Sequence, residues 1–129
     1  MSELLDRIDA CFEQPADELG DDARETFESF LEELEAGRLR AAQPNDHGGW
    51  DVQHSVKRGI LLGFRLGEVE EFESAGPLHF SDKDTYPTQK LPARERNIRV
   101  VPGGSSVRRG AYLGNSVTMM PPAYVNVGA

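Results

Sequence analysis

Residues 98–129 read IRVVPGGSSVRRGAYLGNSVTMMPPAYVNVGA and differ in character from the residues before them. Residues 98–102 are typical of a β-strand, and after them charge falls while small and apolar residues recur in short steps. Four apolar residues lie six positions apart: Val107, Leu113, Met119 and Val125. This period indicates a parallel β-helix solenoid, in which each coil stacks its apolar residue on the coil below. Four repeats are few, so a chance spacing of apolar residues could also produce this period.

The final residues, 124–129, form an apolar, strand-like run with no polar cap. A solenoid needs about three or more repeats to bury its core, and its ends need capping. An uncapped coil leaves an open edge that invites association. We therefore expect residues 1–97 to form an N-terminal domain and residues 98–129 to start a solenoid that is truncated here.

The N-terminal region predicts two amphipathic helices. Residues 3–13 place apolar side chains at helical spacing, with Ser2 as the expected cap. The second helix starts at a capping-box-like pair, Asp22 and Glu25, and ends before Gly37, a typical C-terminal glycine. Its glutamates fall opposite its apolar residues, so we interpret them as a solvated face.

A hairpin and a third helix are expected next. Two short strands, 38–42 and 50–53, flank a run of turn-forming residues. The helix over residues 55–65 contains Gly59 and Gly63, each of which costs ~1 kcal/mol relative to alanine. Because they share one face, they predict close packing of another backbone against this helix.

The remaining N-terminal residues, 68–97, have weak periodicity and several turn formers. They predict an irregular connection with one strand near residues 78–80. The run Gly103-Gly104-Ser105-Ser106 lacks the lysine of a phosphate-binding P-loop, so we interpret it as a junction turn. Met119 and Met120 are interpreted as solenoid filling.

The charge distribution narrows the function classes. The chain carries 14 Lys and Arg against 22 Asp and Glu, a net charge of −8, which argues against general nucleic-acid binding. One stretch is basic and is the natural place for an anionic ligand, with Lys90, Arg94, Arg96, Arg99, Arg108 and Arg109. No signal peptide and no run of ~20 apolar residues is visible, so we expect a cytoplasmic protein without a membrane partner.

Other reactive residue types give no pattern. His47, His54 and His79 are too scattered for a metal-ligand motif, so no metal site is expected. The single cysteine, Cys11, cannot form an internal disulfide and is expected in the core of the first helix.

Several motifs, in the same order along the chain, resemble the tetrahydrodipicolinate N-succinyltransferases. They are residues 98–102, 109–113, 119–121 and 124–129, preceded by residues 37–42, Trp50, residues 57–65 and residues 76–80 with Asp82 and Lys83. The resemblance implies an α/β (α+β) N-terminal domain of about three helices with short strands. That domain leads into the first coils of a left-handed parallel β-helix, a hexapeptide-repeat solenoid, which assembles as a homotrimer.

The resemblance also implies a reaction. The family transfers a succinyl group from succinyl-CoA, a co-substrate, to the amino group of ring-opened tetrahydrodipicolinate in lysine and diaminopimelate biosynthesis. It implies no metal and no permanently bound cofactor. The active sites lie between neighbouring β-helices, in elements that follow Ala129. The general base and oxyanion donors are therefore unknown here, and we expect residues 1–129 alone to be inactive.

Arg99 matches the family position described as substrate-binding. An arginine fork binds a carboxylate through two parallel hydrogen bonds, and the substrate has two carboxylates. The structural alternative is an ion pair with a surface glutamate. Arg65 and Lys83 are further candidate cations. For Arg65 we favour an interaction with a helix dipole, and for Lys83 both interpretations stay open.

Two departures from the family pattern concern local register. Pro122 and Ala123 stand where the family has one residue, which predicts a bulge at that corner, and residues 81–90 match poorly, with Asp84 and Thr85 inserted. Two other functions stay open: a non-catalytic oligomerisation or interaction module, and a different β-helix acyltransferase that uses acetyl-CoA.

Overall fold

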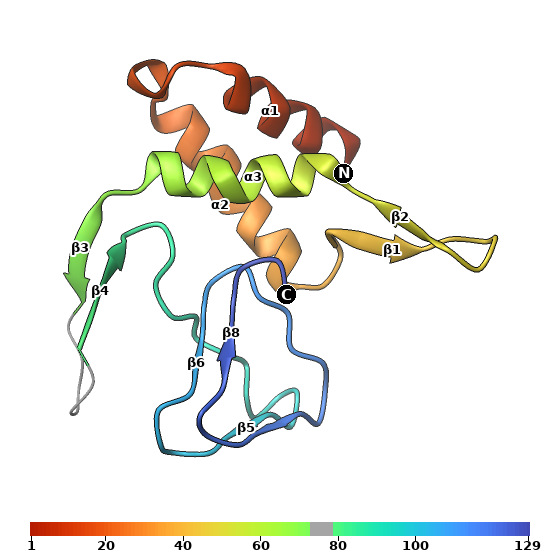
Figure 1. Ribbon diagram of the computed structural model, residues 1–129, viewed down its shortest axis with the longest axis vertical. Coiled ribbons are helices and arrows are strands. Elements are labelled where there is room, and N and C mark those ends of the chain that lie inside the picture. The colour runs from red at the N-terminus through yellow and green to blue at the C-terminus, as the bar shows by residue number, and fades with distance from the viewer. Residues whose placement is uncertain (73–78) are drawn as a thin grey trace.

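The computed structural model describes residues 1–72 and 79–129. Three helices pack together, and the C-terminal residues form a coil beside the end of the second helix (Figure 1). The helices are α1 (Ser2–Glu13), α2 (Asp21–Glu35) and α3 (His54–Leu66), with a 3₁₀ turn at Ala16–Glu18. The predicted helices are thus confirmed to within one or two residues.

The helix ends show which predicted caps were right. Met1 and Gly20 precede α1 and α2 without any side-chain cap, so the predicted capping by Ser2 and Asp22 is wrong. Gly37 is confirmed as the C-terminal glycine of α2, with a φ of +72°. Its N–H donates to the Leu34 carbonyl at 3.0 Å, and the N–H of Arg38 donates to the Glu33 carbonyl at 3.1 Å. These two bonds form a Schellman motif.

The helical core lies between α1, α2 and α3. Its most deeply buried side chains are Phe30, Ile8, Leu31, Leu62 and Val56. A methyl group on Gly59 would lie 2.6 Å from the Phe30 ring, and one on Gly63 would lie 2.4 Å from the Phe27 ring. The predicted close packing is confirmed, but aromatic side chains, not another backbone, occupy the space.

Cys11 is partly buried and packs against this core, as predicted. None of the helices in the described residues is long and apolar enough to cross a membrane.

The first hairpin projects away from the helices (Figure 1) and consists of β1 (Ala42–Pro44) and β2 (Trp50–Val52), paired antiparallel. The predicted hairpin is confirmed, but its first strand begins at Ala42, so the range 38–42 is wrong. Asn45 sets the turn, because its Oδ1 accepts the N–H groups of His47 at 3.1 Å and Gly49 at 2.8 Å.

A second hairpin corrects the predicted irregular connection. Strands β3 (Val69–Phe72) and β4 (Phe80–Lys83) pair antiparallel, with Val69 opposite Lys83. Val69–Glu71 are all exposed, so β3 has no alternating hydrophobic pattern that would reveal a strand. Of the predicted strand at 78–80, residue 78 lies outside the described residues, His79 is not in a strand and Phe80 begins β4.

The C-terminal residues form two parallel strand pairs. β5 (Arg99–Val100) pairs with β7 (Thr118–Met119), and β6 (Ser106–Val107) pairs with β8 (Tyr124–Val125). Ser106 lies opposite Tyr124, eighteen positions on, which is three six-residue steps. Residues 98–116 therefore form one turn of a parallel coil, and the chain from residue 117 onward stacks on it.

The coil interior follows the six-residue period. Val107, Leu113 and Met119 are buried in one cluster, and Val125 packs against it. The period is therefore confirmed as the core of the coil. The interpretation of Met120 as filling is wrong, because that residue is 66% exposed.

An extra residue lies at the first corner of the coil. Arg99 pairs with Thr118, nineteen positions on, whereas the next strands pair at eighteen. The added residue therefore falls between β5 and β6, where Gly103 and Gly104 have φ values of +140° and +97°. Residues 102–104 bend there, as the predicted junction turn requires. Pro122 and Ala123 lie in the corner that stacks on this one in the next turn, which is one residue shorter, so the register shows no added residue there relative to the first turn.

Candidate functional site

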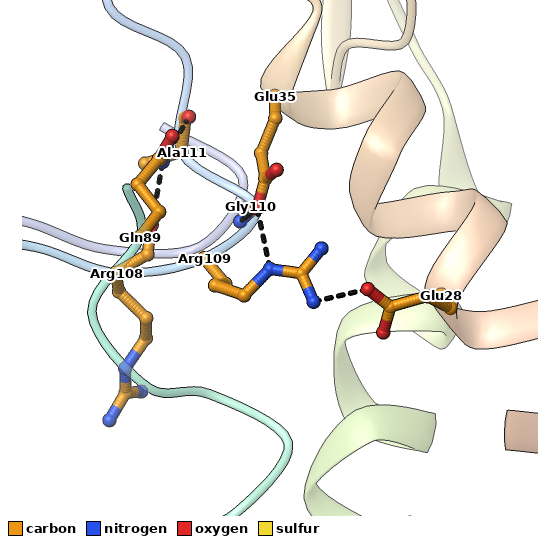
Figure 2. Close-up of polar contacts among 7 residues, drawn as sticks. All are labelled: Glu28, Glu35, Gln89, Arg108, Arg109, Gly110 and Ala111. Carbon is orange, nitrogen blue, oxygen red and sulfur yellow. Dashed lines mark hydrogen bonds and ion pairs between the residues drawn. The ribbon is translucent and has the colours of Figure 1, made fainter. Parts of the chain in front are cut away.

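The basic stretch divides into cations that support the fold and cations that face solvent. Arg108 and Arg109 leave the coil in different directions, Arg109 toward α2 and Arg108 away from it (Figure 2). Gln89 donates to the carbonyl oxygens of Arg108 at 3.0 Å and Ala111 at 2.7 Å (Figure 2).

Arg109 joins the coil to α2. Its Nε donates to Glu35 Oε1 at 3.0 Å, and its Nη1 contacts Glu28 (Figure 2). The same Glu35 oxygen accepts the Gly110 N–H at 2.9 Å. Partial burial lowers the pKa of Arg109, but its hydrogen bonds to Glu28 and Glu35 outweigh burial and raise it. Arg109 is thus a structural cation.

Arg96 also has a structural role. It donates to the Leu113 carbonyl, and its guanidinium carbon lies 4.8 Å from the centre of the Tyr112 ring. Arg40, which follows the end of α2, lies over the same ring at 4.4 Å. The Tyr112 ring therefore contacts two cations, Arg40 from the segment after α2 and Arg96 from the segment before β5.

Arg99 differs from these arginines. Its backbone N–H donates to the Val117 carbonyl at 2.9 Å and fixes β5 to the second turn. Its side chain is exposed, and within the described residues it forms no hydrogen bond or ion pair. Lys90 and Arg94 are exposed as well. Arg99 therefore presents an unengaged guanidinium from a fixed strand, an arrangement that can bind a carboxylate.

The two further candidate cations are engaged in the fold. Arg65 donates to the carbonyls of Phe12 at 2.7 Å and Gln14 at 2.5 Å, so it binds the C-terminal end of α1. The predicted interaction of Arg65 with the C-terminal end of a helix is confirmed, but that helix is α1, whereas Arg65 itself lies on α3. Lys83 donates to the Gly67 carbonyl at 3.0 Å.

Sequence patterns did not indicate a pocket of about 420 Å³ between the second hairpin and the coil. We call it the hairpin pocket; it is lined by Phe72, Phe80, Asp82, Tyr86, Arg108 and Tyr124, among others. Burial raises the pKa of Tyr86, and nearby Arg108 acts in the opposite direction. Its hydroxyl donates to the Ile60 carbonyl at 2.7 Å. The sequence signal for this pocket was Arg108, which the sequence analysis placed in the basic stretch although its side chain pairs with Asp82.

Within residues 1–72 and 79–129 no three His, Cys, Asp or Glu side chains gather in a way that suits a metal ion. His47, His54 and His79 are all exposed.

Comparison with known proteins shows which family the chain resembles. The family model for the tetrahydrodipicolinate N-succinyltransferase N-terminal domain matches residues 3–66, which contain all three helices and the first hairpin. This chain resembles the N-terminal part of the tetrahydrodipicolinate N-succinyltransferases.

Several bacterial relatives carry the name 2,3,4,5-tetrahydropyridine-2,6-dicarboxylate N-succinyltransferase. The protein from Xylella fastidiosa (strain Temecula1 / ATCC 700964) is 37% identical over 118 residues, covering 88% of this chain and 41% of the relative. The protein from Aromatoleum aromaticum is 37% identical over 135 residues, covering all of this chain and 48% of the relative. The protein from Acinetobacter baylyi is 37% identical with the same coverage.

The chain therefore spans a little under half the length of these N-succinyltransferases. Similarity extends through the coil that carries Arg99, well past the residues that the family model matches.

Proposed function

We propose that this chain supplies the N-terminal portion of an acyltransferase. The enzyme transfers a succinyl group from succinyl-CoA to the amino group of ring-opened tetrahydrodipicolinate. The observation that carries the proposal is 37% identity, along the whole chain, to relatives bearing the name of that enzyme. We further propose a cytoplasmic location and succinyl-CoA as a co-substrate only, with no resident cofactor.

The fold proposal extends the observed coil. Residues 1–97 form the N-terminal domain, and residues 98–129 begin a left-handed parallel β-helix that continues in the longer enzyme. The eighteen-residue offset between Ser106 and Tyr124 supports it, because a coil of three six-residue steps has that length. Homotrimer assembly belongs to the same proposal, with the active sites between neighbouring β-helices.

Arg99 has a specific role in this proposal: its guanidinium binds a substrate carboxylate. The exposed, unengaged side chain supports this role, as does its position on a strand held by the adjacent turn. A planar fork offers two parallel donors to the two carboxylate oxygens, which fixes orientation as well as supplying charge.

The test is steady-state kinetics of the complete enzyme with Arg99→Ala and Arg99→Lys. We expect the alanine variant to raise the KM for tetrahydrodipicolinate by about 10- to 100-fold, the range for losing hydrogen bonds to a charged group. The KM of Arg99→Lys should lie between those of the wild type and Arg99→Ala, because lysine keeps the charge but lacks the planar fork. Arg94→Ala, another exposed arginine, is the matched control and should leave KM unchanged. An unchanged KM in Arg99→Ala would refute this role.

A further inference from the structure

The hairpin pocket is separate from Arg99. Arg99 lies on β5, whereas the pocket is bounded by the other parallel pair, through Ser106 of β6 and Tyr124 of β8, and by Phe72 and Phe80 of the second hairpin. Its volume of about 420 Å³ lies within the ~300–1,000 Å³ typical of small-molecule sites.

Aromatic rings form much of its wall. Phe72 and Phe80 come from the hairpin, Tyr86 from the segment after it and Tyr124 from the second turn of the coil. Tyr86 is held in place, since its hydroxyl donates to Ile60 and its ring packs edge-on against Phe27 at 5.6 Å between centroids. Phe80 and Tyr124 are 42% and 58% exposed, so their rings, backed by the buried Tyr86, suit a flat, apolar ligand that can stack.

The polar side of the pocket is an ion pair, Arg108 with Asp82. Arg108 also donates to Asn126 Oδ1 at 3.3 Å and lies 5.4 Å from the centre of the Tyr86 ring. A guanidinium has five N–H donors, and the hydrogen bonds of Arg108 to Asp82 and Asn126 use two of them. Asp82 retains 39% of its side-chain exposure, and no described residue donates to its Oδ1. The pair therefore offers a donor beside an acceptor.

This arrangement selects against charged ligands. The two opposite charges neutralise each other, and the other polar side chains of the lining carry only hydroxyls, those of Thr88, Ser106, Tyr86 and Tyr124. A free anion would meet the Asp82 carboxylate, and a free cation would meet the Arg108 guanidinium. A neutral edge with one acceptor and one donor complements both partners at once.

We propose that the hairpin pocket binds a neutral planar ring whose edge carries an adjacent hydrogen-bond acceptor and donor. Aromatic amides and nucleobases both have this edge. The ring stacks between the aromatic walls, its acceptor faces Arg108 and its donor faces Asp82. This binding does not depend on the acyl-transfer function, so either proposal can fail alone.

The test is an NMR titration of the isotope-labelled protein with nicotinamide and, separately, cytidine. We expect saturable shifts at the backbone amides of Thr88, Ser106 and Arg108, with a Kd in about the millimolar range for so small a probe. Response to nicotinamide alone would assign the site to aromatic amides, and response to cytidine alone or to both would extend it to nucleobases. Cyclohexanecarboxamide, which has the amide edge without a flat ring, should bind at least about fivefold more weakly.

Matched variants separate stacking from general loss of an aromatic side chain. Tyr124→Ala should weaken binding about tenfold, the scale of one lost stacking contact. Trp50→Ala removes an aromatic that is 67% exposed on the other hairpin and should change nothing. Ser106→Phe should fill the pocket and abolish binding, and the same spectra report whether each variant is folded. The proposal is overturned by absent saturable shifts, by equal binding of cyclohexanecarboxamide, or by unchanged affinity in a folded Tyr124→Ala or Ser106→Phe protein.

Discussion

Gly63 shows at the residue scale how closely α3 approaches its neighbours. A methyl group there would lie 2.2 Å from Tyr86 Oη and 2.4 Å from the Phe27 ring. Sequence alone indicated that a small residue was needed at this position but not what filled the space. Tyr86 lies 23 positions further on, beyond a hairpin that the sequence did not reveal, so its approach to Gly63 was not predictable.

We predict that Gly63→Ala lowers the free energy of unfolding by about 1–2 kcal/mol. Alanine gains ~1 kcal/mol of helix propensity, but overpacking a fixed core costs about 1–3 kcal/mol and outweighs the gain here. The control is Gly114→Ala, where the nearest atom, Val117 Cγ2, is 4.0 Å away. Urea denaturation of both variants measures the difference, and a Gly63→Ala protein as stable as wild type would contradict the packing described.

Tyr86 predicts a pH dependence. Burial raises the pKa of its hydroxyl above the ordinary value of about 10, so the folded chain holds this proton at a pH where the unfolded chain has lost it. The stabilising contribution is therefore complete below pH ~10 and declines as pH rises above that value. Tyrosinate absorbance, compared with Tyr86→Phe, should show one tyrosine that ionises only at higher pH or on unfolding. If all three tyrosines ionise normally in folded protein, Tyr86 is not buried as described.

At the element scale, the helices were predictable and the short strands were not. The spacing of apolar residues in α2 identified its buried face, because a long amphipathic helix repeats its pattern several times. Strands of two to four residues are too short to repeat a hydrophobic pattern, and in β3 the residues Val69–Glu71 are all exposed. The coil strands were indicated only by their shared six-residue period. The pocket between the second hairpin and the coil therefore could not be predicted, although Arg108 was noted as a cation.

The contact between α2 and the coil gives a prediction at this scale. Glu35 accepts hydrogen bonds from both the Arg109 side chain and the Gly110 backbone. Glu35→Ala removes both and leaves two partly buried donors unpaired, which should cost about 1–3 kcal/mol.

Glu32→Ala is the matched control, since Glu32 is exposed on the same helix and no described residue bonds to its side chain. Thermal unfolding should show a lower Tm for Glu35→Ala alone. Hydrogen exchange at Gly110 should also become faster in that variant. Equal effects of the two substitutions would mean that Glu35 does not join the helices to the coil.

At the scale of the whole molecule, the chain combines a helical unit with the start of a parallel coil. The helices match the N-terminal family model, and the eighteen-residue register between β6 and β8 gives the six-residue period a structural form. The resemblance motifs were scattered and individually weak, yet their common order indicated the same family as the comparisons, because order along the chain is harder to match by chance than any short motif. Roles beyond the described coil, including the general base, could not be predicted from these residues.

The most direct measurement is thiol release from acyl-CoA by the complete enzyme to which we assign this chain, purified from its source organism. We predict that free coenzyme A appears only when succinyl-CoA and tetrahydrodipicolinate are both present, and that acetyl-CoA is a much poorer donor. Equal use of acetyl-CoA would favour a different β-helix acyltransferase. No release with either donor would contradict the acyltransferase account.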